Sequence, residues 1–492
     1  MVPCLVVLLP ALVAGLDLRL PVLGFGARCV RTEQVVARAA LVGGHSLLLL
    51  EIPVPAVVVH RSSVAHGRAS PVMRRSAVGC IRSYADRMHV TLRPDRLVAG
   101  GEAMARQEGG DHDGRVVFVE GALPGELVEV ELASAKKDYA KGSVIEVLER
   151  SPLRDSPSCA HRRAGCGGCD WMHLNPSGQL DAKAEIVAES LRRVGRLESA
   201  AVERIVAVGA AVSPFGYRTT IRVVGGPGDV VGFREQGSDR VIAASSCPVA
   251  ESTLSRLLPL LDLDENAEVT LRTSVATGAI TAIWSRAHRH GVRGLPSGVH
   301  IGERAWLTER VAGVDLRVSA GSFFQSGQQA AELLVDAVRR AAPELVGAAH
   351  AVDAYGGVGL FAATTMADAR RVTLVESARS ACRDAEHNLV DRAGADVVCS
   401  EIGTWAVDEQ LPSADVVVAD PARPGLARPG TERLVALSPQ VLVLISCDPV
   451  SLARDVTLLG AAGYVPERVE VLDLFPQTHH VETVTRFTRP GS

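Results

Sequence analysis

A short segment near the C-terminus, Ser446-Cys447-Asp448-Pro449, places a thiol directly after an apolar run at residues 441–445. Such a run is typical of a buried strand, so Cys447 should lie at the carboxyl edge of a sheet, where open α/β folds bind ligands. Glu482 follows in a short C-terminal segment and supplies a carboxylate. A deprotonated thiol with a carboxylate partner can carry out covalent catalysis on a pyrimidine ring. A lone cysteine is more often a buried small hydrophobe, so its neighbours decide between the two interpretations.

The segments that must position this thiol alternate between strand and helix from about residue 319. This alternation predicts a doubly wound sheet of the Rossmann type. A helix at 328–341 would precede a strand at 349–354, a glycine turn and another helix. The remaining predicted strands cover 371–375, 416–419 and 441–445, and the residues that follow them are Glu376, Asp420 and Ser446-Cys447.

The glycine turn reads Asp353-x-Tyr355-x-Gly357-x-Gly359, a pattern that can serve NAD, FAD or S-adenosylmethionine. Glu376, at the end of the next predicted strand, is placed to accept hydrogen bonds from ribose hydroxyls. The turn has the short D-x-x-x-G-x-G form rather than G-x-G-x-x-G, and no pyrophosphate need be held. The pattern therefore favours S-adenosylmethionine, and a tight turn without a ligand is the alternative.

The loop at residues 420–425 begins with Asp420 and contains Arg423 between two prolines. It can present a carboxylate and a guanidinium to the edge of a flipped base. An ordinary turn is the alternative, but the position directly before the strand that leads to Cys447 favours function.

Ten cysteines are present, and their spacing does not indicate a disulfide framework. Cys159, Cys166 and Cys169 form a C-x6-C-x2-C cluster, and Cys247 is the best candidate for a fourth ligand. Thiolate-only ligation at irregular spacing suits a [4Fe–4S] cluster, with tetrahedral zinc as the alternative. Disulfides between them are a further alternative, poorly suited to a reducing cytosol.

Residues 88–150 predict a small OB-type β-barrel, because short strand-like runs alternate with glycine turns. The loop before its last predicted strand holds three of the four lysines of the chain, Lys136, Lys137 and Lys141. It also holds an aromatic side chain, Tyr139. Ammonium groups beside an aromatic ring can contact phosphate and base, whereas a solvated hairpin tip is the alternative. Between this barrel and residue 319, residues 151–318 predict a central α+β domain that carries the cysteine cluster.

With 492 residues, 47% hydrophobic and 22% charged, the chain reads as a soluble multidomain α/β protein. Its net charge is −4, but residues 1–87 carry +6 and the remainder −10, so any RNA contact must be concentrated in patches. Residues 1–87 have neither a helical nor an alternating period, and we expect a disordered or artefactual extension. Their apolar stretches predict neither a signal peptide nor a membrane span.

Several ordered motifs of this chain resemble those of the RNA uracil-5 methyltransferase family. They are Phe323-Phe324-Gln325, residues 353–359, residues 420–425, residues 446–449 with Leu452-Ala453-Arg454-Asp455, and Phe475-Pro476-Gln477-Thr478-His479-His480-Val481-Glu482. The four clustered cysteines and the 88–150 segment, which resembles a TRAM domain, extend the match toward the iron–sulfur branch that acts on 23S ribosomal RNA. The resemblance covers roughly residues 88–492.

The resemblance implies that Cys447 is the nucleophile and Glu482 the base. It also implies that the cofactor and uracil pocket is lined by Gln325, Tyr355, Glu376 and Asp420. Two departures stand out: Asp448 replaces the family's usual asparagine, and the family's further cofactor-contacting asparagine has no convincing counterpart between Glu376 and Asp420.

The expected activity is methyl transfer from S-adenosylmethionine to C5 of a uridine in 23S rRNA or tRNA, by a cytoplasmic monomer with no membrane association. An RNA cytosine-5 methyltransferase is the nearest alternative, although that class generally carries a cysteine in the acidic loop, and residues 420–425 have none. A non-catalytic RNA-binding or redox protein is the distant alternative. The co-occurrence of a cofactor turn, a thiol and a carboxylate in one domain argues against it.

Overall fold

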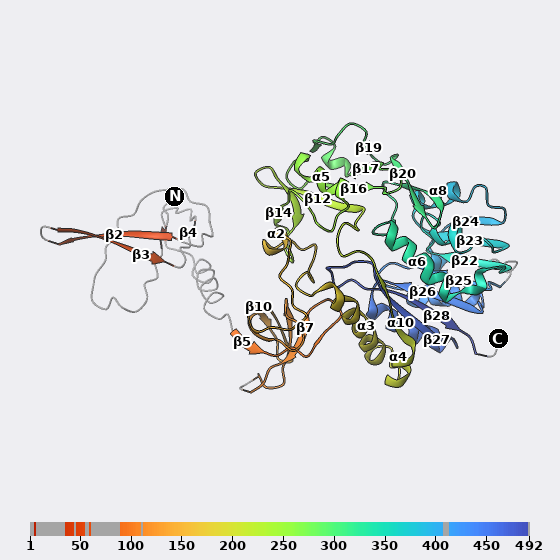
Figure 1. Cartoon of the computed structure of the whole chain (residues 1–492), viewed down its shortest axis with the longest axis horizontal. Coiled ribbons are helices and arrows are strands. Elements are labelled where there is room, and N and C mark those ends of the chain that lie inside the picture. Colours follow the sequence, from red (N-terminus) through yellow and green to blue (C-terminus); the bar gives the residue numbers. More distant parts are fainter. Residues whose placement is uncertain are drawn as a thin grey trace, which may run out of the picture. The chain divides into compact units, whose positions relative to one another are not determined.

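The computed structural model describes residues 89–109, 112–406 and 413–490, together with the backbone of four strands in residues 1–60. The chain divides into two compact units, Met1–Arg87 and Met88–Ser492 (Figure 1). In the first unit, β1 (Cys4–Leu5) pairs antiparallel with β4 (Val59–His60), and β2 (Val35–Gly43) pairs antiparallel with β3 (Ser46–Val54). The other residues of 1–87 lie outside the described part, and the proposed disordered or artefactual extension stays a prediction.

The second unit begins with a six-stranded sheet in the order β5-β9-β10-β8-β7-β6. Its strands are β5 (His89–Leu92), β6 (Arg96–Leu97), β7 (Ala103–Arg106), β8 (Val116–Glu120), β9 (Leu127–Ala135) and β10 (Tyr139–Glu149). Alternate residues of β8 and β9 are buried, as expected for strands with one covered face. Trp171, Leu174 and Ile186 from the following segment complete this core, so the β5–β10 sheet is packed against its neighbours.

The central part is a second six-stranded sheet in the order β14-β13-β12-β16-β17-β19. It contains β12 (Thr220–Gly226), β13 (Val230–Arg234), β14 (Val241–Ala243), β16 (Glu268–Thr273), β17 (Ile280–Trp284) and β19 (His300–Ile301). The helix α5 (Ser252–Leu257) packs on β16, and β15 (Asp262–Leu263) pairs with β18 (Val292–Arg293). The hairpin β20 (Trp306–Val311) and β21 (Val314–Ser319) leads into the C-terminal sheet domain.

The C-terminal sheet has the order β11-β27-β28-β26-β25-β22-β23-β24. Its strands are β11 (Val206–Ala211), β22 (His350–Ala354), β23 (Arg371–Glu376), β24 (Ala395–Cys399), β25 (Val416–Ala419), β26 (Val441–Ser446), β27 (Val465–Asp473) and β28 (Glu482–Thr488). The strands from β22 to β26 are parallel, and β28 runs antiparallel to both β26 and β27. The chain order reverses between β22 and β25, which is where a doubly wound sheet opens a ligand crevice.

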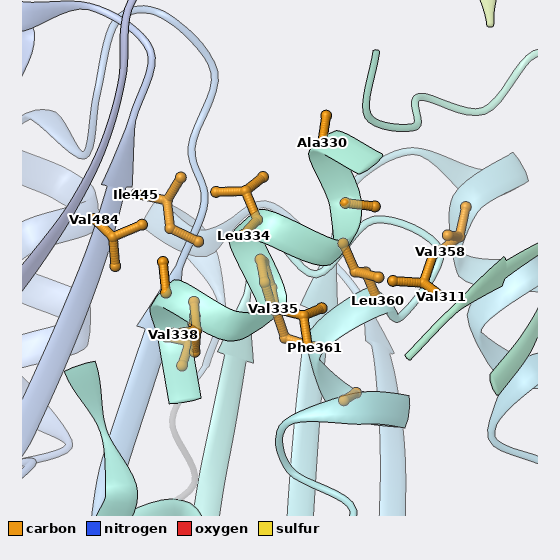
Figure 2. Close-up of a cluster of buried hydrophobic side chains, with 14 of the residues drawn as sticks. Val311, Ala330, Leu334, Val335, Val338, Val358, Leu360, Phe361, Ile445 and Val484 are labelled. Carbon is orange, nitrogen blue, oxygen red and sulfur yellow. The ribbon is translucent and has the colours of Figure 1, made fainter. Parts of the chain in front are cut away.

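Helices cover both faces of this sheet, as the uninterrupted apolar run of β26 predicts. One face packs against α6 (Gln328–Ala341), α7 (Leu360–Thr364) and α8 (Arg379–Asn388), and the other against α3 (Pro176–Arg193), α4 (Ser199–Ile205), α9 (Ala427–Ala436) and α10 (Pro449–Ala461). Figure 2 shows Leu334 and Val338 of α6 beside Ile445 of β26 and Val484 of β28. This packing holds the end of β26 against β28.

The first part of the segment predicted as a central domain, residues 151–318, packs with the C-terminal sheet. Helix α3 packs on α10 and β27, and β11 pairs in parallel with β27. Helix α3 also begins earlier than its apolar period suggests, because the Asn175 side chain caps it by accepting from the Gly178 amide and Pro176 occupies its first turn. The first part of the central segment therefore supports the C-terminal sheet.

A buried ion pair ties α3 to the end of β27. The Lys183 ammonium lies 2.6 Å from Asp473 Oδ1, and the side chains are 0% and 2% exposed. Lys183 also donates to the Phe475 carbonyl at 3.2 Å. Burial lowers the pKa of Lys183 and raises that of Asp473, so each charge depends on the other to remain ionised.

Replacement of Lys183 by Met should therefore destabilise the protein strongly, by about 3–5 kcal/mol, because Asp473 would keep its burial and lose its partner. Urea unfolding of the wild type and the variant measures the loss. Lys141→Met is the matched control, since that ammonium pairs with Glu102 at 2.8 Å while 52% exposed, and its removal should cost less than about 1 kcal/mol. Equal losses in the two variants would contradict this account.

Candidate active site

Cys447 and Glu482 are brought together by the pairing of β26 with β28. The last register pair at this end joins Ser446 to Thr483, and Thr483 Oγ1 donates to the Ser446 carbonyl at 3.1 Å. The strands are antiparallel, so the residue after Ser446 and the residue before Thr483 face each other across the same strand ends. These residues are Cys447 and Glu482, which lie 35 positions apart in the chain.

The Cys447 thiol is half-buried, and its pKa is raised to about 12. Burial is the main cause, followed by the charges of Glu482 and Asp420. Arg423 acts in the opposite direction, and so does the amino-terminal end of α10, which begins two residues later. In the ligand-free protein the thiol is therefore protonated at neutral pH, and a ligand must change the charge balance to activate it.

Asp420 and Glu482 form a second group of coupled charges. Gln325 donates from Nε2 to Asp420 Oδ2 at 3.3 Å, which opposes the effect of burial. Burial nevertheless raises the pKa of Asp420 to about 7. The pKa of Glu482 is raised well above its usual value by burial and by the neighbouring Asp420. A cation placed between these carboxyl groups would stabilise their ionised forms.

The glycine turn after β22 closes on Glu376. The Gly357 amide donates to Glu376 Oε2 at 3.0 Å, and the Ala378 amide donates to Oε1 at 2.6 Å. Gly357 and Gly359 have φ values of 56° and 90°, which a side chain would strain. Glu376 is thus held at the carboxyl edge of the sheet beside the turn.

Asp353, the first residue of the glycine motif, is fully buried at the end of β22. Its Oδ2 accepts from the Ala362 amide at 2.9 Å, while Oδ1 has no hydrogen-bond partner. Burial raises its pKa to about 7, with additional effects of Asp420 and Glu376. An unpartnered buried carboxyl oxygen beside two other carboxylates fits a site for a cationic cofactor.

Tyr355 has a left-handed backbone with φ of 59°, and its ring packs toward α9. A Cβ at Gly430 of α9 would lie 2.6 Å from the Tyr355 hydroxyl oxygen, so this close approach requires a glycine. Burial raises the Tyr355 pKa to about 12, and the hydroxyl stays neutral. Its predicted contact with a cofactor stays a prediction.

The loop at 420–425 is positioned by Asp455, the acidic residue of the Leu452-Ala453-Arg454-Asp455 motif. Its carboxylate accepts from the amides of Leu426 at 2.8 Å and Ala427 at 3.2 Å. Arg423 Nη2 in this loop lies 3.1 Å from His480 Nδ1, and burial lowers the His480 pKa to about 3, so that ring is neutral and can accept. The Arg423 guanidinium also lowers the pKa of Cys447, so it favours the thiolate.

Arg454, in the same motif as Asp455, donates to Ser451 Oγ at 2.6 Å. Asp448, which departs from the family pattern, caps α10: its Oδ1 accepts from the Ser451 amide at 2.7 Å. Aspartate and asparagine are comparable N-caps. The acid is therefore engaged with the helix, which accounts structurally for its presence.

The loop at 474–481, which carries the residues before Glu482, is held by hydrogen bonds from distant segments. The Trp171 amide donates to the Gln477 carbonyl at 3.0 Å, and the Gln477 amide donates to Gln179 Oε1 at 2.6 Å. The Tyr217 hydroxyl donates to the Pro476 carbonyl at 3.0 Å. Sequence reasoning missed these positioning residues.

His479 joins the same loop to the cysteine loop (residues 159–171). Its Nδ1 lies 2.6 Å from Asp170 Oδ2, next to Cys169. The β5–β10 sheet also meets this junction, because Trp171 Nε1 donates to the Gly101 carbonyl at 2.9 Å. A Cβ at Gly101 would lie 2.6 Å from that of His479. The three segments therefore converge at the loop that positions Glu482.

The four clustered cysteines line one cavity of about 340 Å³, together with Arg218. Burial raises the pKa of Cys169 to about 12, and it also raises the pKa values of Cys166 and Cys247. In the described part of the chain, no three His, Cys, Asp or Glu side chains lie close enough to hold one metal ion. The four thiols therefore share one cavity, and the metal or cluster expected there stays a prediction.

Exposed groups suited to nucleic acid lie on the β5–β10 sheet and beside Gln325. Lys136 Nζ lies 5.0 Å from the centre of the Tyr139 ring, and Lys141 Nζ lies 5.8 Å from that of Phe118. Tyr139 and Lys141 belong to β10 rather than to the predicted loop. Phe323, two residues before Gln325, is 72% exposed.

Within the described residues, no helix is long and apolar enough to cross a bilayer.

Comparisons with known proteins decide the family. Residues 96–145 match the TRAM domain. An uncharacterized RNA methyltransferase of Thermosynechococcus vestitus is 31% identical over 453 residues, which cover 81% of this chain and 98% of that protein. The chain belongs to the RNA uracil-5 methyltransferase family. The resemblance expected from the ordered motifs, and the TRAM domain expected in residues 88–150, are thereby confirmed.

Two further family members extend the match. The 23S rRNA (uracil(1939)-C(5))-methyltransferase RlmD of Halomonas elongata is 29% identical, over 87% of this chain and 97% of that protein. The crystal structure of Pyrococcus abyssi tRNA (uracil-54, C5)-methyltransferase in complex with S-adenosyl-L-homocysteine superposes with a TM-score of 0.60 and 24% identity, covering 82% of this chain and all of that one. This likeness shows a methyltransferase fold, in agreement with the doubly wound sheet predicted from the sequence.

The raised carboxyl pKa values predict how stability depends on pH. An acid with a raised folded pKa binds its proton more tightly when folded, so this stabilisation is complete below about pH 4 and is lost as the pH rises through about 7. The free energy of unfolding of the ligand-free protein should fall over that window, and Asp420→Asn should flatten the slope. Denaturant unfolding at a series of pH values measures it.

Asp336→Asn is the matched control, since that carboxylate is 56% exposed on α6 and should leave the slope unchanged. An Asp420→Asn slope that matches the wild type would show that Asp420 does not hold a raised pKa.

Proposed function

We propose that this chain transfers a methyl group from S-adenosylmethionine to C5 of a uridine in RNA. The observation that carries the proposal is the pairing of β26 with β28, which sets Cys447 opposite Glu482 beside Asp420. A nucleophilic thiol, a carboxylate base and a cofactor turn at one sheet edge are what this reaction requires. The RlmD relative and the likeness to the tRNA uracil methyltransferase support the same reaction.

The carboxyl groups of this edge would hold the cofactor. Glu376, fixed by the Gly357 amide, would accept from the ribose hydroxyls. Asp420 and the unpartnered oxygen of Asp353 would face its positive groups, with Gln325 orienting Asp420. When bound, S-adenosylmethionine supplies an electrophilic methyl group. Its positive charge would also favour the ionised forms of the buried acids.

Cys447 and Glu482 would then divide the work on the base. C5 of uracil is too weak a nucleophile alone, but addition of the Cys447 thiolate to C6 produces an enolate that is nucleophilic at C5. After methyl transfer, Glu482 would take the C5 proton, and Cys447 would leave by elimination. Because burial raises the Glu482 pKa, its carboxylate is suited to accept that proton.

Activation of the thiol requires a net gain of positive charge near Cys447. Arg423 and the amino-terminal end of α10 already favour the thiolate, and the two buried carboxylates oppose it. A bound cationic cofactor would offset those carboxylates and lower the Cys447 pKa from about 12. This ordering would keep the thiol unreactive until the cofactor is present.

The RNA would reach the site over two groups of side chains. The lysines near Tyr139 would contact phosphates, and Phe323 would lie beside a uracil taken out of its stack. The extensive match to RlmD favours 23S rRNA over tRNA. A cytoplasmic monomer remains our expectation for the working form.

The cysteine cavity would hold a [4Fe–4S] cluster through Cys159, Cys166, Cys169 and Cys247. Methyl transfer needs no electron, so its role would be structural. It would fix the cysteine loop, whose Asp170 contacts His479 before the catalytic base. The cluster would thus act on geometry rather than on chemistry.

Cys447→Ala should abolish turnover, because no other thiol faces Glu482 in the described residues. Glu482→Gln should stall after methyl transfer and accumulate a covalent protein–RNA complex, since the C5 proton would have no acceptor. Methyl incorporation from labelled S-adenosylmethionine and denaturing electrophoresis measure the two effects. An active Cys447→Ala variant would rule out this nucleophile.

Cells that lack the gene, complemented with the wild type or with Cys447→Ala, show which nucleobase is methylated and in which RNA. Mass spectrometry of ribosomal and transfer RNA should show loss of one 5-methyluridine that only the wild type restores. Loss of 5-methylcytidine would instead identify the cytosine-5 alternative. The RNA fraction that loses the nucleoside identifies the substrate.

The protein purified without oxygen should contain about four iron ions per chain and absorb visible light broadly, as cysteine-ligated clusters do. Cys169→Ser should lose most of this iron because Cys169 lines the cavity, whereas Cys447→Ala should keep it. Elemental analysis and absorption spectra give the readout independently of activity. Stoichiometric zinc in place of iron would contradict the cluster and support the alternative metal.

A further inference from the structure

Cys382 and Cys399 lie outside the cysteine cavity and close together beside Glu376. Their Cα atoms are 5.9 Å apart, within the range of a disulfide, and the structure joins them by one. The sequence gives no sign of this pair, because a separation of 17 residues carries no recognisable signature. They come together because Cys382 lies on α8 and Cys399 ends β24, the strand at the edge of the sheet.

This pair contacts the residue that we assign to the cofactor ribose. Cys399 is the register partner of Glu376 between β24 and β23, and the following amide, that of Ser400, donates to the Glu376 carbonyl at 2.8 Å. Cys382 Sγ lies 3.3 Å from the same carbonyl. The two sulfurs therefore lie where the ends of β23 and β24 meet the first turn of α8, next to Glu376.

The two cysteine residues differ in exposure. Cys399 is exposed, whereas Cys382 is 3% exposed beneath it. An exposed thiolate is oxidised first, and a neighbouring buried thiol can then resolve it. The order of events follows from this burial difference.

We propose that Cys382 and Cys399 form a reversible disulfide that regulates cofactor binding at Glu376. The Cys399 thiolate attacks a peroxide oxygen, which gives a sulfenic acid and releases hydroxide or water. Cys382 then attacks that sulfur, the S–S bond forms, and the sulfenic hydroxyl leaves as water. Overall two thiols and one hydrogen peroxide give one disulfide and two waters. A cellular thiol reverses the step by exchange and becomes a disulfide itself.

The oxidised form should bind the cofactor more tightly. The bond ties the edge strand β24 to α8, and the Glu376 carboxylate is itself held by the Ala378 amide just before α8 begins. Reduction removes this link between β24 and α8. Strand β24 lies at the edge of the sheet and is then held by its pairing with β23. Binding to the reduced form must then order both strand ends, which weakens affinity. This inference rests on the proposed use of Glu376 in the cofactor site.

Calorimetric titration of the full chain with S-adenosylhomocysteine tests the proposal. The protein is compared after reduction and after a brief peroxide treatment, and peptide mass spectrometry maps the Cys382–Cys399 bond. All measurements use a Cys447→Ala background, so that oxidation of that thiol does not contribute. We expect affinity to be about fivefold or more tighter in the oxidised form, the lower end of coupling between sites. Cys399→Ser and Cys382→Ser should each abolish the difference.

Equal affinities in the two forms, or a peroxide effect that persists in both serine variants, would overturn the proposal. So would the absence of the mapped bond after peroxide treatment. Failure of both forms to bind S-adenosylhomocysteine would instead overturn the cofactor site itself, and the regulation with it. The serine variants retain the cysteine cavity, which controls for oxidation there.

Discussion

The antiparallel register between β26 and β28 is the constraint on which the site depends. Because Ser446 pairs with Thr483, Cys447 and Glu482 occupy facing positions at one strand end. A shift of one residue would turn each side chain to the opposite face and separate the thiol from the carboxylate. The apolar packing of Ile445 and Val484 against α6 fixes that register, so the hydrophobic core determines the catalytic geometry.

The same edge concentrates acids that the folded protein leaves poorly solvated. Asp353, Asp420 and Glu482 all have raised pKa values, and burial is the first cause in each case. Such a group destabilises the ligand-free fold at neutral pH, which is the common cost of a preorganised site. A cationic ligand would offset that cost, because it stabilises the ionised carboxyl groups and counters their effect on Cys447. In the proposed mechanism, cofactor binding and thiol activation would therefore be coupled through the charges of this edge.

The residues at strand ends could be predicted from the sequence, because each apolar run is followed by a single polar residue that marks the sheet edge. Glu376, Asp420 and Cys447 were found in this way. The contacts that position them could not be predicted, since Asp170 and His479 are 309 residues apart and nothing in the sequence indicates that they pair. The family resemblance supplied roles for residues, but it carried no information on the Cys382–Cys399 pair, which depends on how α8 packs over β24.

The loop at 474–481 explains why the domains must act together. It lies between β27 and β28 and makes short-range turn contacts, such as the Thr478 amide to the Phe475 carbonyl at 3.2 Å, and groups from other segments add further hydrogen bonds to it. Lys183 holds its beginning and Asp170 holds its end, one from α3 and one from the cysteine loop. Because Glu482 follows directly, any change that moves the cysteine loop also moves the base. The cluster that we propose for that loop would thus act on the geometry of the site without taking part in the reaction.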